Sequence, residues 1–238
     1  MSDPKKTLTF YGLILVTVSA AALLSAFIFP GNSKVAAPSL GRAWSFAVLG
    51  GSTVTNTGAT SITGDLGVSS PGLSVTGFPP GTQARGVQHV GDPAANQAQG
   101  DAQGAYAALA GMPCNTALTG QDLGGKALAP GVYCFTSSAQ LTGQLVLDGR
   151  GNSKGVWVFQ IASTLTSATN SSVVMRKSGR PGNVFWQVGS GATLGTGTAF
   201  IGNILAYSSI TMNTAANLSG RALARQAVTM DSNNMRVP

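Results

Sequence analysis

Over most of the chain, apolar and polar residues alternate in short runs that end at Gly, Ser, Asn or Asp. Such alternation between turn residues is typical of half-buried β-strands. From residue 118 onward these runs follow one another, as in GVYCFTS, QLTGQLVLDG, GVWVFQIAS and NVFWQVGSG. The pattern predicts a mostly β protein built from short strands.

One segment, residues 92–112, has a helical pattern instead. Its small apolar residues recur every three or four positions, at Ala94, Ala98, Ala102, Ala105 and Leu109. Asp92 is a suitable N-cap and Pro93 suits the first helical position. We expect one helix that lies flat against other elements, because its small side chains permit a close approach.

The stretch 202–233 nearly repeats itself. GNILA at 202–206 returns as GRALA at 220–224, and SITM at 209–212 returns as AVTM at 227–230, so both echoes have the same offset. A period of about 18 residues fits a parallel β-solenoid whose coils hold three short strands. Looser copies are STLTSATN (163–170) and GATLGTGT (191–198). In this register the inward residues are Leu165, Leu194, Ile210, Met212, Val228 and Met230.

The residues between these inward positions form a polar column on the outside of the solenoid. They are Thr164, Thr166, Thr193, Gly195, Thr211, Asn213, Thr229 and Asp231. Repeated Thr on one face suggests a binding surface, but Thr is also an ordinary solvent-facing strand residue. Periodicity alone leaves both interpretations open.

The N-terminus carries an uncharged, largely apolar stretch, residues 7–29, preceded by Lys5 and Lys6. This length can cross the hydrocarbon core of a membrane as a helix, and the lysines favour an N-terminus kept inside. An uncleaved anchor is favoured over a signal peptide, whose apolar core is usually shorter. The expected organisation is a membrane anchor or signal segment at 1–30, a linker at 31–43 and a solenoid domain at 44–238. Either form of the first segment exports the domain to an extracellular or cell-surface location.

Composition argues against several functions. Charged residues make up 9% of the chain, Glu is absent and His89 is the one histidine. The net charge of +7 is scattered, whereas nucleic-acid binders cluster their cations. Several of the exported Asp residues fall in predicted turns or the helix, where capping is a simpler role than that of a glycosidase carboxylate. His89 is interpreted as a solvated loop residue. We therefore predict no enzyme, no cofactor, no metal site and no nucleic-acid partner.

Two further expectations concern packing. Cys114 and Cys134 are the only two cysteines, and export would permit a disulfide between them. Trp44, Trp157 and Trp186 lie in apolar contexts that predict core packing rather than a sugar-binding platform.

A series of motifs, in order over about residues 44–233, resembles the DUF3494 ice-binding protein family of microbial antifreeze proteins. The motifs are FAVLGGSTVTNTG, TSITGDLGVSSPG, VTGFPPGT, DPAANQAQGDAQGAYAALAG, DLGGKALAPGVYCF, QLTGQLVLDG, VWVFQI, NVFWQVGSGATLGTGT, FIGNILAYSSIT and NLSGRALARQAVTMD. The resemblance implies a discontinuous right-handed parallel β-solenoid of triangular section with a long helix alongside. It also implies a protein that adsorbs to the surface of ice crystals. We further expect a monomer, with the membrane as a second partner if residues 7–29 are retained. A cell-surface adhesion or structural module is the alternative function.

The ice face of that family often carries a T-A/G-x-T/N pattern. Residues 57–60 (TGAT) and 214–217 (TAAN) match it, and residues 190–193 (SGAT) depart from it at one position. Together with the polar column, this predicts a set of ice-binding residues. They are Thr57, Thr60, Thr164, Thr166, Ser190, Thr193, Thr211, Asn213, Thr214, Asn217 and Thr229.

Overall fold

The computed structural model describes residues 35–71 and 74–238. The chain divides into two units, Met1–Lys34 and Val35–Pro238, and the second is described here. The apolar stretch 7–29 lies outside the described residues. Residues 35–43, assigned to a linker from the sequence, belong to the second unit, and Leu40 and Ala43 are buried in it. The described ranges contain no helix that is both long and apolar enough to span a membrane.

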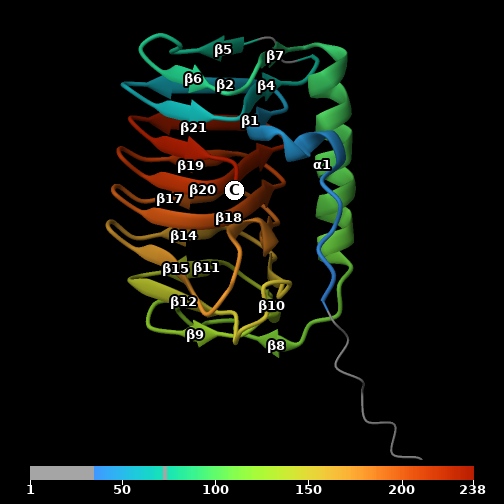
Figure 1. Ribbon diagram of the computed structural model, residues 1–238, viewed down its shortest axis with the longest axis vertical. Helices are drawn as coiled ribbons and strands as arrows, with labels where there is room; N and C mark the ends of the chain where they lie inside the picture. Colours follow the sequence, from blue (N-terminus) through green and yellow to red (C-terminus); the bar gives the residue numbers. More distant parts are fainter. Residues whose placement is uncertain (1–34, 72–73) are drawn as a thin grey trace, which may run out of the picture. The chain divides into compact units, whose positions relative to one another are not determined.

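Short parallel strands stacked in coils form this unit, and a full coil contributes one strand to each of three faces (Figure 1). This confirms the predicted parallel β-solenoid. One face is a seven-stranded sheet, called here the seven-stranded face. Its strands, in spatial order, are β11 (Ala139–Leu141), β14 (Leu165–Ser167), β17 (Ala192–Leu194), β19 (Ile210–Met212), β21 (Ala227–Asp231), β2 (Thr53–Thr57) and β5 (Ser74–Thr76).

A 15-stranded sheet bends around the other two faces. The face next to the helix holds β8 (Thr116–Ala117), β10 (Gly131–Phe135), β13 (Trp157–Ile161), β16 (Val184–Val188), β1 (Phe46–Gly50), β4 (Asp65–Val68) and β7 (Gln88–Val90). The third face holds β9 (Ala127–Leu128), β12 (Gln144–Asp148), β15 (Ser172–Arg176), β22 (Asn234–Arg236), β3 (Ser61–Thr63) and β6 (Thr82–Ala84). The long strands β18 (Ala199–Ala206) and β20 (Asn217–Ala224) bridge both faces, since β18 pairs with β15 near its start and with β16 near its end.

The period detected in the sequence is confirmed by the strand pairing. Ile210 pairs with Val228, and Ala199 pairs with Asn217, which is the offset of the two echoes. Earlier coils are longer, since Ala139 pairs with Leu165 and Leu165 in turn pairs with Ala192. Loops at 149–156 and 177–183 hold much of the extra length, which explains why the repeat is plain only near the C-terminus.

The chain does not pass through the stack in sequence order. β1 pairs with β20, β2 with β21 and β3 with β22, so the N-terminal coils lie on top of the C-terminal coil. After β7 the helix α1 (Pro93–Ala110) carries the chain along the stack toward β8, from which the coils build back (Figure 1). Its 18 residues span about 27 Å at 1.5 Å per residue. The helix therefore supplies the long return that a discontinuous solenoid requires.

The start of α1 agrees with the prediction. The Asp92 carboxylate accepts a hydrogen bond from the Ala95 amide at 2.8 Å, and Pro93 is the first helical residue. The buried stripe is Ala95, Ala98, Gln99, Ala102, Ala105 and Leu109. Ala94 was wrongly placed in this stripe, because the face that packs on the sheet follows the alternating three- and four-residue spacing that begins at Ala95.

His89 is not the solvated loop residue that the sequence suggested. It lies in β7, with its ring centroid 5.3 Å from that of Phe46 and its Nδ1 2.7 Å from an oxygen of Asp92. The hydrogen bonds from the Ala95 amide and from His89 lower the pKa of Asp92 below its usual value of 3.8. The histidine and the helix cap therefore form one polar unit.

This unit makes stability depend on pH. Because the folded-state pKa of Asp92 is depressed, its contribution is present above the unfolded pKa near 3.8 and is lost as the pH falls through the folded value. We expect urea-unfolding midpoints to fall as the pH drops from about 5 to about 2, with Asp92→Asn reducing the slope of that fall. An unchanged slope in the variant would show that other carboxylates account for the acid sensitivity.

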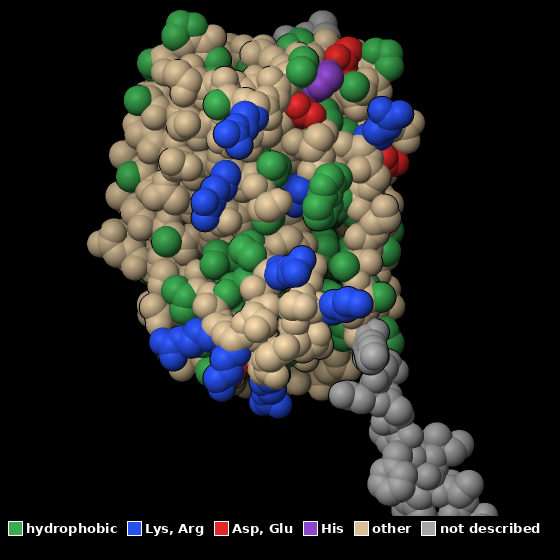
Figure 2. Space-filling view, in the orientation of Figure 1, with side chains coloured by type: hydrophobic (Ala, Val, Ile, Leu, Met, Phe, Trp, Pro, Cys, Tyr) green, Lys and Arg blue, Asp and Glu red, His purple; other side chains and the backbone are tan. Residues whose placement is uncertain are grey.

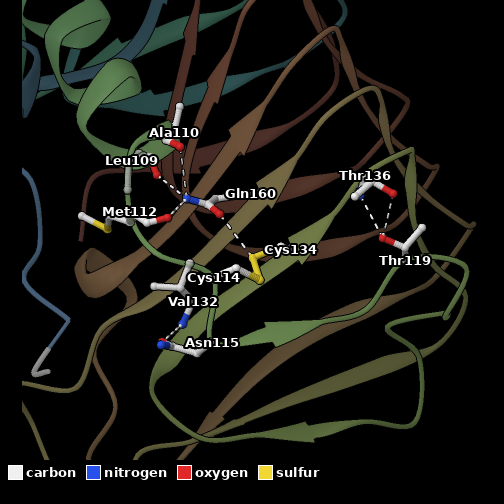
Figure 3. Close-up of a disulfide and its surroundings, with 10 residues drawn as sticks. All are labelled: Leu109, Ala110, Met112, Cys114, Asn115, Thr119, Val132, Cys134, Thr136 and Gln160. Carbon is white, nitrogen blue, oxygen red and sulfur yellow. Dashed lines mark hydrogen bonds between the residues drawn. A yellow bond between two sulfur atoms is a disulfide. The ribbon is translucent and has the colours of Figure 1, made fainter. Parts of the chain in front are cut away.

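A disulfide joins Cys114 and Cys134, as predicted, with their Cα atoms 6.0 Å apart. It fastens the segment that follows α1 to strand β10 (Figure 3). Beside it, the Gln160 side chain from β13 donates hydrogen bonds to the carbonyls of Leu109 and Met112, at 2.7 and 2.8 Å. The end of α1 is thus tied to the stack covalently and by hydrogen bonds.

Removing the disulfide is expected to destabilise the domain by about 3 kcal/mol, the value for closing a loop of this length in the unfolded chain. The double variant Cys114→Ala/Cys134→Ala, followed by guanidinium unfolding, measures this. Reduction of the unaltered protein should produce the same loss. A variant as stable as the original would mean that the hydrogen bonds of Gln160 suffice to hold the helix end.

The core is filled by aromatic side chains stacked from coil to coil. Ring centroids of Tyr133 and Phe159 are 5.5 Å apart, those of Phe159 and Trp186 are 3.9 Å apart, and those of Trp186 and Phe200 are 4.8 Å apart. Trp157 and Trp186 are fully buried, as predicted. Trp44 contradicts the prediction: it ends the short helix η1 (Gly41–Trp44) and is 54% exposed, because η1 lies outside the coils.

Candidate functional site

A column of threonines runs across the seven-stranded face. The pairing register places six of them side by side, one per strand, continued by Gln140 at one end. In spatial order they are Thr166, Thr193, Thr211, Thr229, Thr55 and Thr76. Since neighbouring strands are about 4.8 Å apart, the threonines repeat at that spacing.

The residues beneath the column hold it in place. Except for Thr76, which ends β5, each Thr stands between two inward-facing residues of its strand. Around Thr211 these are Ile210 and Met212, which are 0–1% exposed. All six predicted inward residues, from Leu165 to Met230, are buried. The pairings of this sheet carry no register shift. A regular backbone ladder over a filled core gives a stiff surface.

A second line of residues flanks the column, two positions along each strand. Thr57 is paired with Asp231, and Asn213 occupies the corresponding place one coil below. Asp231 is the one charged residue within the strands of this face. Its two carboxylate oxygens accept hydrogen bonds from the hydroxyls of Thr214 and Ser232, so the charge is held at the end of β21, beside the column.

The predicted ice-binding residues fall into three groups: those in the central column, those beside it or at the corners, and two that lie away from this face. Thr166, Thr193, Thr211 and Thr229 lie in the central column, whereas Thr57, Thr164, Ser190, Asn213 and Thr214 lie beside it or at the corners. Thr164 donates to the Ser138 hydroxyl at 2.9 Å.

Two predicted residues cannot lie on this face. Thr60 is fully buried, and its hydroxyl accepts a hydrogen bond from the Asn233 amide. Asn217 begins β20 and pairs with Ala199 and Asn234 on the third face. The four-residue pattern that suggested them spans a corner of the solenoid, so its first and last residues belong to different surroundings.

Thr55 and Thr76 were missed. The alternation of TVTNT at 53–57 indicates that Thr55 lies on the outward side of a strand. Its neighbour on the adjacent strand, Thr229, is 174 residues away in sequence. Their hydroxyl oxygens are 3.3 Å apart. No local pattern reports that pairing, because the N-terminal strands join the sheet out of sequence order.

The fold and this surface define a class of protein: a discontinuous parallel β-solenoid with a flat, threonine-rich and nearly uncharged face. Comparisons with known proteins agree. The model of a family described as ice-binding-like matches residues 48–236. The chain belongs to this ice-binding-like family.

Relatives and solved structures extend the comparison. An ice-binding protein of Nostoc sp. (strain HG1) is 53% identical over 228 residues, which cover 94% of this chain and 81% of that relative. The crystal structure of an ice-binding protein from the Antarctic ascomycete Antarctomyces psychrotrophicus superposes with a TM-score of 0.81 at 42% identity, covering 84% of this chain and 98% of that one. An ice-binding protein from an Antarctic biological consortium gives a TM-score of 0.83 at 45% identity, covering 86% and 92%.

Proposed function

We propose that this protein adsorbs to ice through the seven-stranded face and thereby inhibits ice growth and recrystallisation. The observation that carries the proposal is the in-register column of six threonines. The family membership and the names of the relatives support the same function.

The physical basis is a match between a regular surface and ordered water. Residues two apart on a strand are about 6.7 Å from each other, and adjacent strands about 4.8 Å, so methyls and hydroxyls recur on a two-dimensional grid. Branching at Cβ restricts the rotamers of Thr, so few side-chain conformations are lost on adsorption. Methyl groups order the adjacent water while hydroxyls anchor it. A charge would hold water in a competing geometry. The position of Asp231 at the end of β21, outside the column and hydrogen-bonded to two hydroxyls, therefore favours adsorption.

Adsorption requires no chemical step, and the carboxylates are engaged in structural roles. Asp92 caps α1, Asp122 accepts from the amides of Gly124 and Thr142, and Asp148 accepts from the Arg150 amide and from Lys177. Hydrogen bonds from these partners lower the pKa of Asp92 and of Asp148, whereas a general acid needs a raised pKa. We therefore propose a non-catalytic protein.

Export completes the proposal. An extracellular or cell-surface location would bring the domain into contact with ice, and the disulfide is of a kind that persists in oxidising compartments. Residues 7–29 would direct export, either as a retained anchor or as a cleaved signal.

Thermal hysteresis and ice-crystal shape, observed in a nanolitre osmometer, test the function. We expect a gap between melting and freezing points together with faceted crystals. Round crystals and no gap, with circular dichroism showing a folded protein, would contradict ice binding and favour an adhesion module.

A further inference from the structure

The two loops that lengthen the lower coils lie at one corner of the solenoid, between the third face and the face next to α1. Residues 149–156 connect β12 to β13, and residues 177–183 connect β15 to β16. The minimal coil needs neither loop, since the shorter coils near the C-terminus close without them. Insertions gathered on one side of a repeat protein often build a binding surface.

Positive charge is concentrated in this region. Residues 148–180 contain five cations, Arg150, Lys154, Arg176, Lys177 and Arg180, against the single acid Asp148. Residues 35–238 hold 11 cations and six acids, a net charge of +5, so the net +4 of this stretch is most of the total. Figure 2 shows Lys and Arg side chains at intervals over the visible face from near its top to its lower end, whereas most of the visible acidic side chains lie near its top.

A buried arginine extends the charge toward α1. Arg221 is 1% exposed, and its guanidinium donates to the Trp44 carbonyl and to Oδ1 of Asn203, each at 2.8 Å. Burial lowers the pKa of Arg221 only to about 10, so the side chain stays charged at neutral pH. Among the described residues the salt bridges are His89–Asp92 and Lys177–Asp148, so no carboxylate there neutralises Arg221.

Trp44 lies directly over this arginine. The Arg221 guanidinium carbon is 4.1 Å from the centroid of the Trp44 ring, yet Trp44 is 54% exposed. Placing a charge against one face of the indole holds the ring in a fixed orientation. More than half of the Trp44 surface remains open to solvent.

Hydrogen bonds join these parts into one surface. Asn203 donates to the Gly182 carbonyl at 3.0 Å, which links Arg221 to the short helix η2 (Pro181–Asn183). Asn183 donates to the Ser153 carbonyl at 3.3 Å, which links η2 to the first loop. An open cleft of about 350 Å³ lies between the two loops and the segment 35–37. Its polar lining is Ser153, Lys154, Arg180 and Asn183, and its apolar lining is Val35, Ala36, Ala37 and Val156.

We propose that this surface, called here the basic corner and defined by Trp44, Lys154, Arg180 and Arg221, binds an acidic polysaccharide. The carboxylates of uronate units would pair with Lys154 and Arg180, and sugar hydroxyls would meet Ser153 and Asn183 in the cleft. The apolar side of one pyranose ring would lie on the exposed indole of Trp44. Arg221 would hold that ring in position and add positive potential.

The composition of the corner favours a polysaccharide over other polyanions. A single-stranded nucleic acid is held by several aromatic rings that stack successive bases, but the other large exposed apolar residues, Val87, Val90 and Tyr207, lie outside this surface. A lipid surface would call for large apolar side chains that enter it, and among the described residues Trp44 is the one large exposed apolar side chain at this corner. The basic corner uses no strand of the seven-stranded face, so a bound polysaccharide would leave the threonine column accessible.

Binding of the full chain to polygalacturonate, with neutral dextran as the control polymer, tests this at room temperature without ice. Isothermal titration should show binding to polygalacturonate and none to dextran. Lys154→Gln/Arg180→Gln should weaken it by about tenfold or more, because two charge-assisted contacts are removed. Trp44→Ala should also weaken it, although it changes no charge. The matched control Arg85→Gln/Arg225→Gln, which removes two exposed cations elsewhere, should bind like the unaltered protein.

Several results would overturn the proposal. Equal losses in the two double variants would show a general charge effect, and full binding by a folded Trp44→Ala variant would remove the stacking platform. Vesicles of phosphatidylglycerol and phosphatidylcholine that bind with the same dependence on Lys154 and Arg180 would assign the corner to a lipid surface. Single-stranded DNA behaving in this way would assign it to nucleic acid. None of these results bears on thermal hysteresis, so this proposal and ice binding fail independently.

Discussion

Replacing Thr211 by Tyr is expected to remove most of the thermal hysteresis while leaving the domain folded. Thr211 stands near the middle of the column, with Thr193 and Thr229 on the strands on either side. A tyrosine ring at this position would rise above the plane of the neighbouring methyl groups. Because the surface is stiff, it could not bend to restore contact with a flat crystal plane. The loss of thermal hysteresis should therefore be larger than expected from removing one of the six column threonines.

The domain should tolerate this change. The Thr211 side chain points away from the core, tyrosine is a favourable strand residue, and surface substitutions usually alter stability by less than about 0.5 kcal/mol. A nanolitre osmometer gives the hysteresis, and circular dichroism with a thermal melt reports folding.

Ser219→Tyr is the matched control for that substitution. Ser219 lies in a central strand of the third face, paired with Ile201 and Arg236, and like Thr211 is partly exposed. It should retain full hysteresis. A folded Thr211→Tyr variant with unchanged hysteresis would remove this strand from the ice-binding site. Loss of activity in Ser219→Tyr instead would move the site to the third face.

Replacing Trp186 by Ala is expected to cost about 4 kcal/mol of folding free energy, the range for truncating a large buried aromatic. Trp186 is fully buried between Phe159 and Phe200, and its indole nitrogen donates to the Ile201 carbonyl at 2.9 Å. The variant would leave a cavity in the middle of the stack and a carbonyl without its partner. Guanidinium unfolding followed by far-UV circular dichroism measures the change.

Trp186→Phe separates the contributions to that loss. It keeps an aromatic ring in the stack and removes the hydrogen bond, so the expected cost is smaller, about 1–2 kcal/mol. If Trp186→Ala unfolded within about 1 kcal/mol of the unaltered protein, the aromatic stack would not be a major source of core stability. Both variants leave the surface of the seven-stranded face unaltered. Below their unfolding temperatures they should shape ice crystals like the original.

The sequence by itself determined the local structure of this protein. Alternating apolar and polar residues identified the strands, Asp92 and Pro93 identified the start of α1, and the repeated stretch near the C-terminus gave the register from β18 to β21. The same repeat separated inward from outward residues, because successive side chains along a strand point to opposite faces of the sheet. Four of the six column threonines followed from it.

The tertiary structure alone decided which strands become neighbours. Thr55 joins the column because β2 lies on β21, a pairing between residues 174 apart in sequence. Thr60 and Asn217 leave the site because a corner separates them from the face, and Trp44 is exposed because η1 lies outside the coils. A local pattern records how a strand divides its side chains between core and solvent. The order of the stack depends on contacts between distant segments, which leave no periodic signal in the sequence.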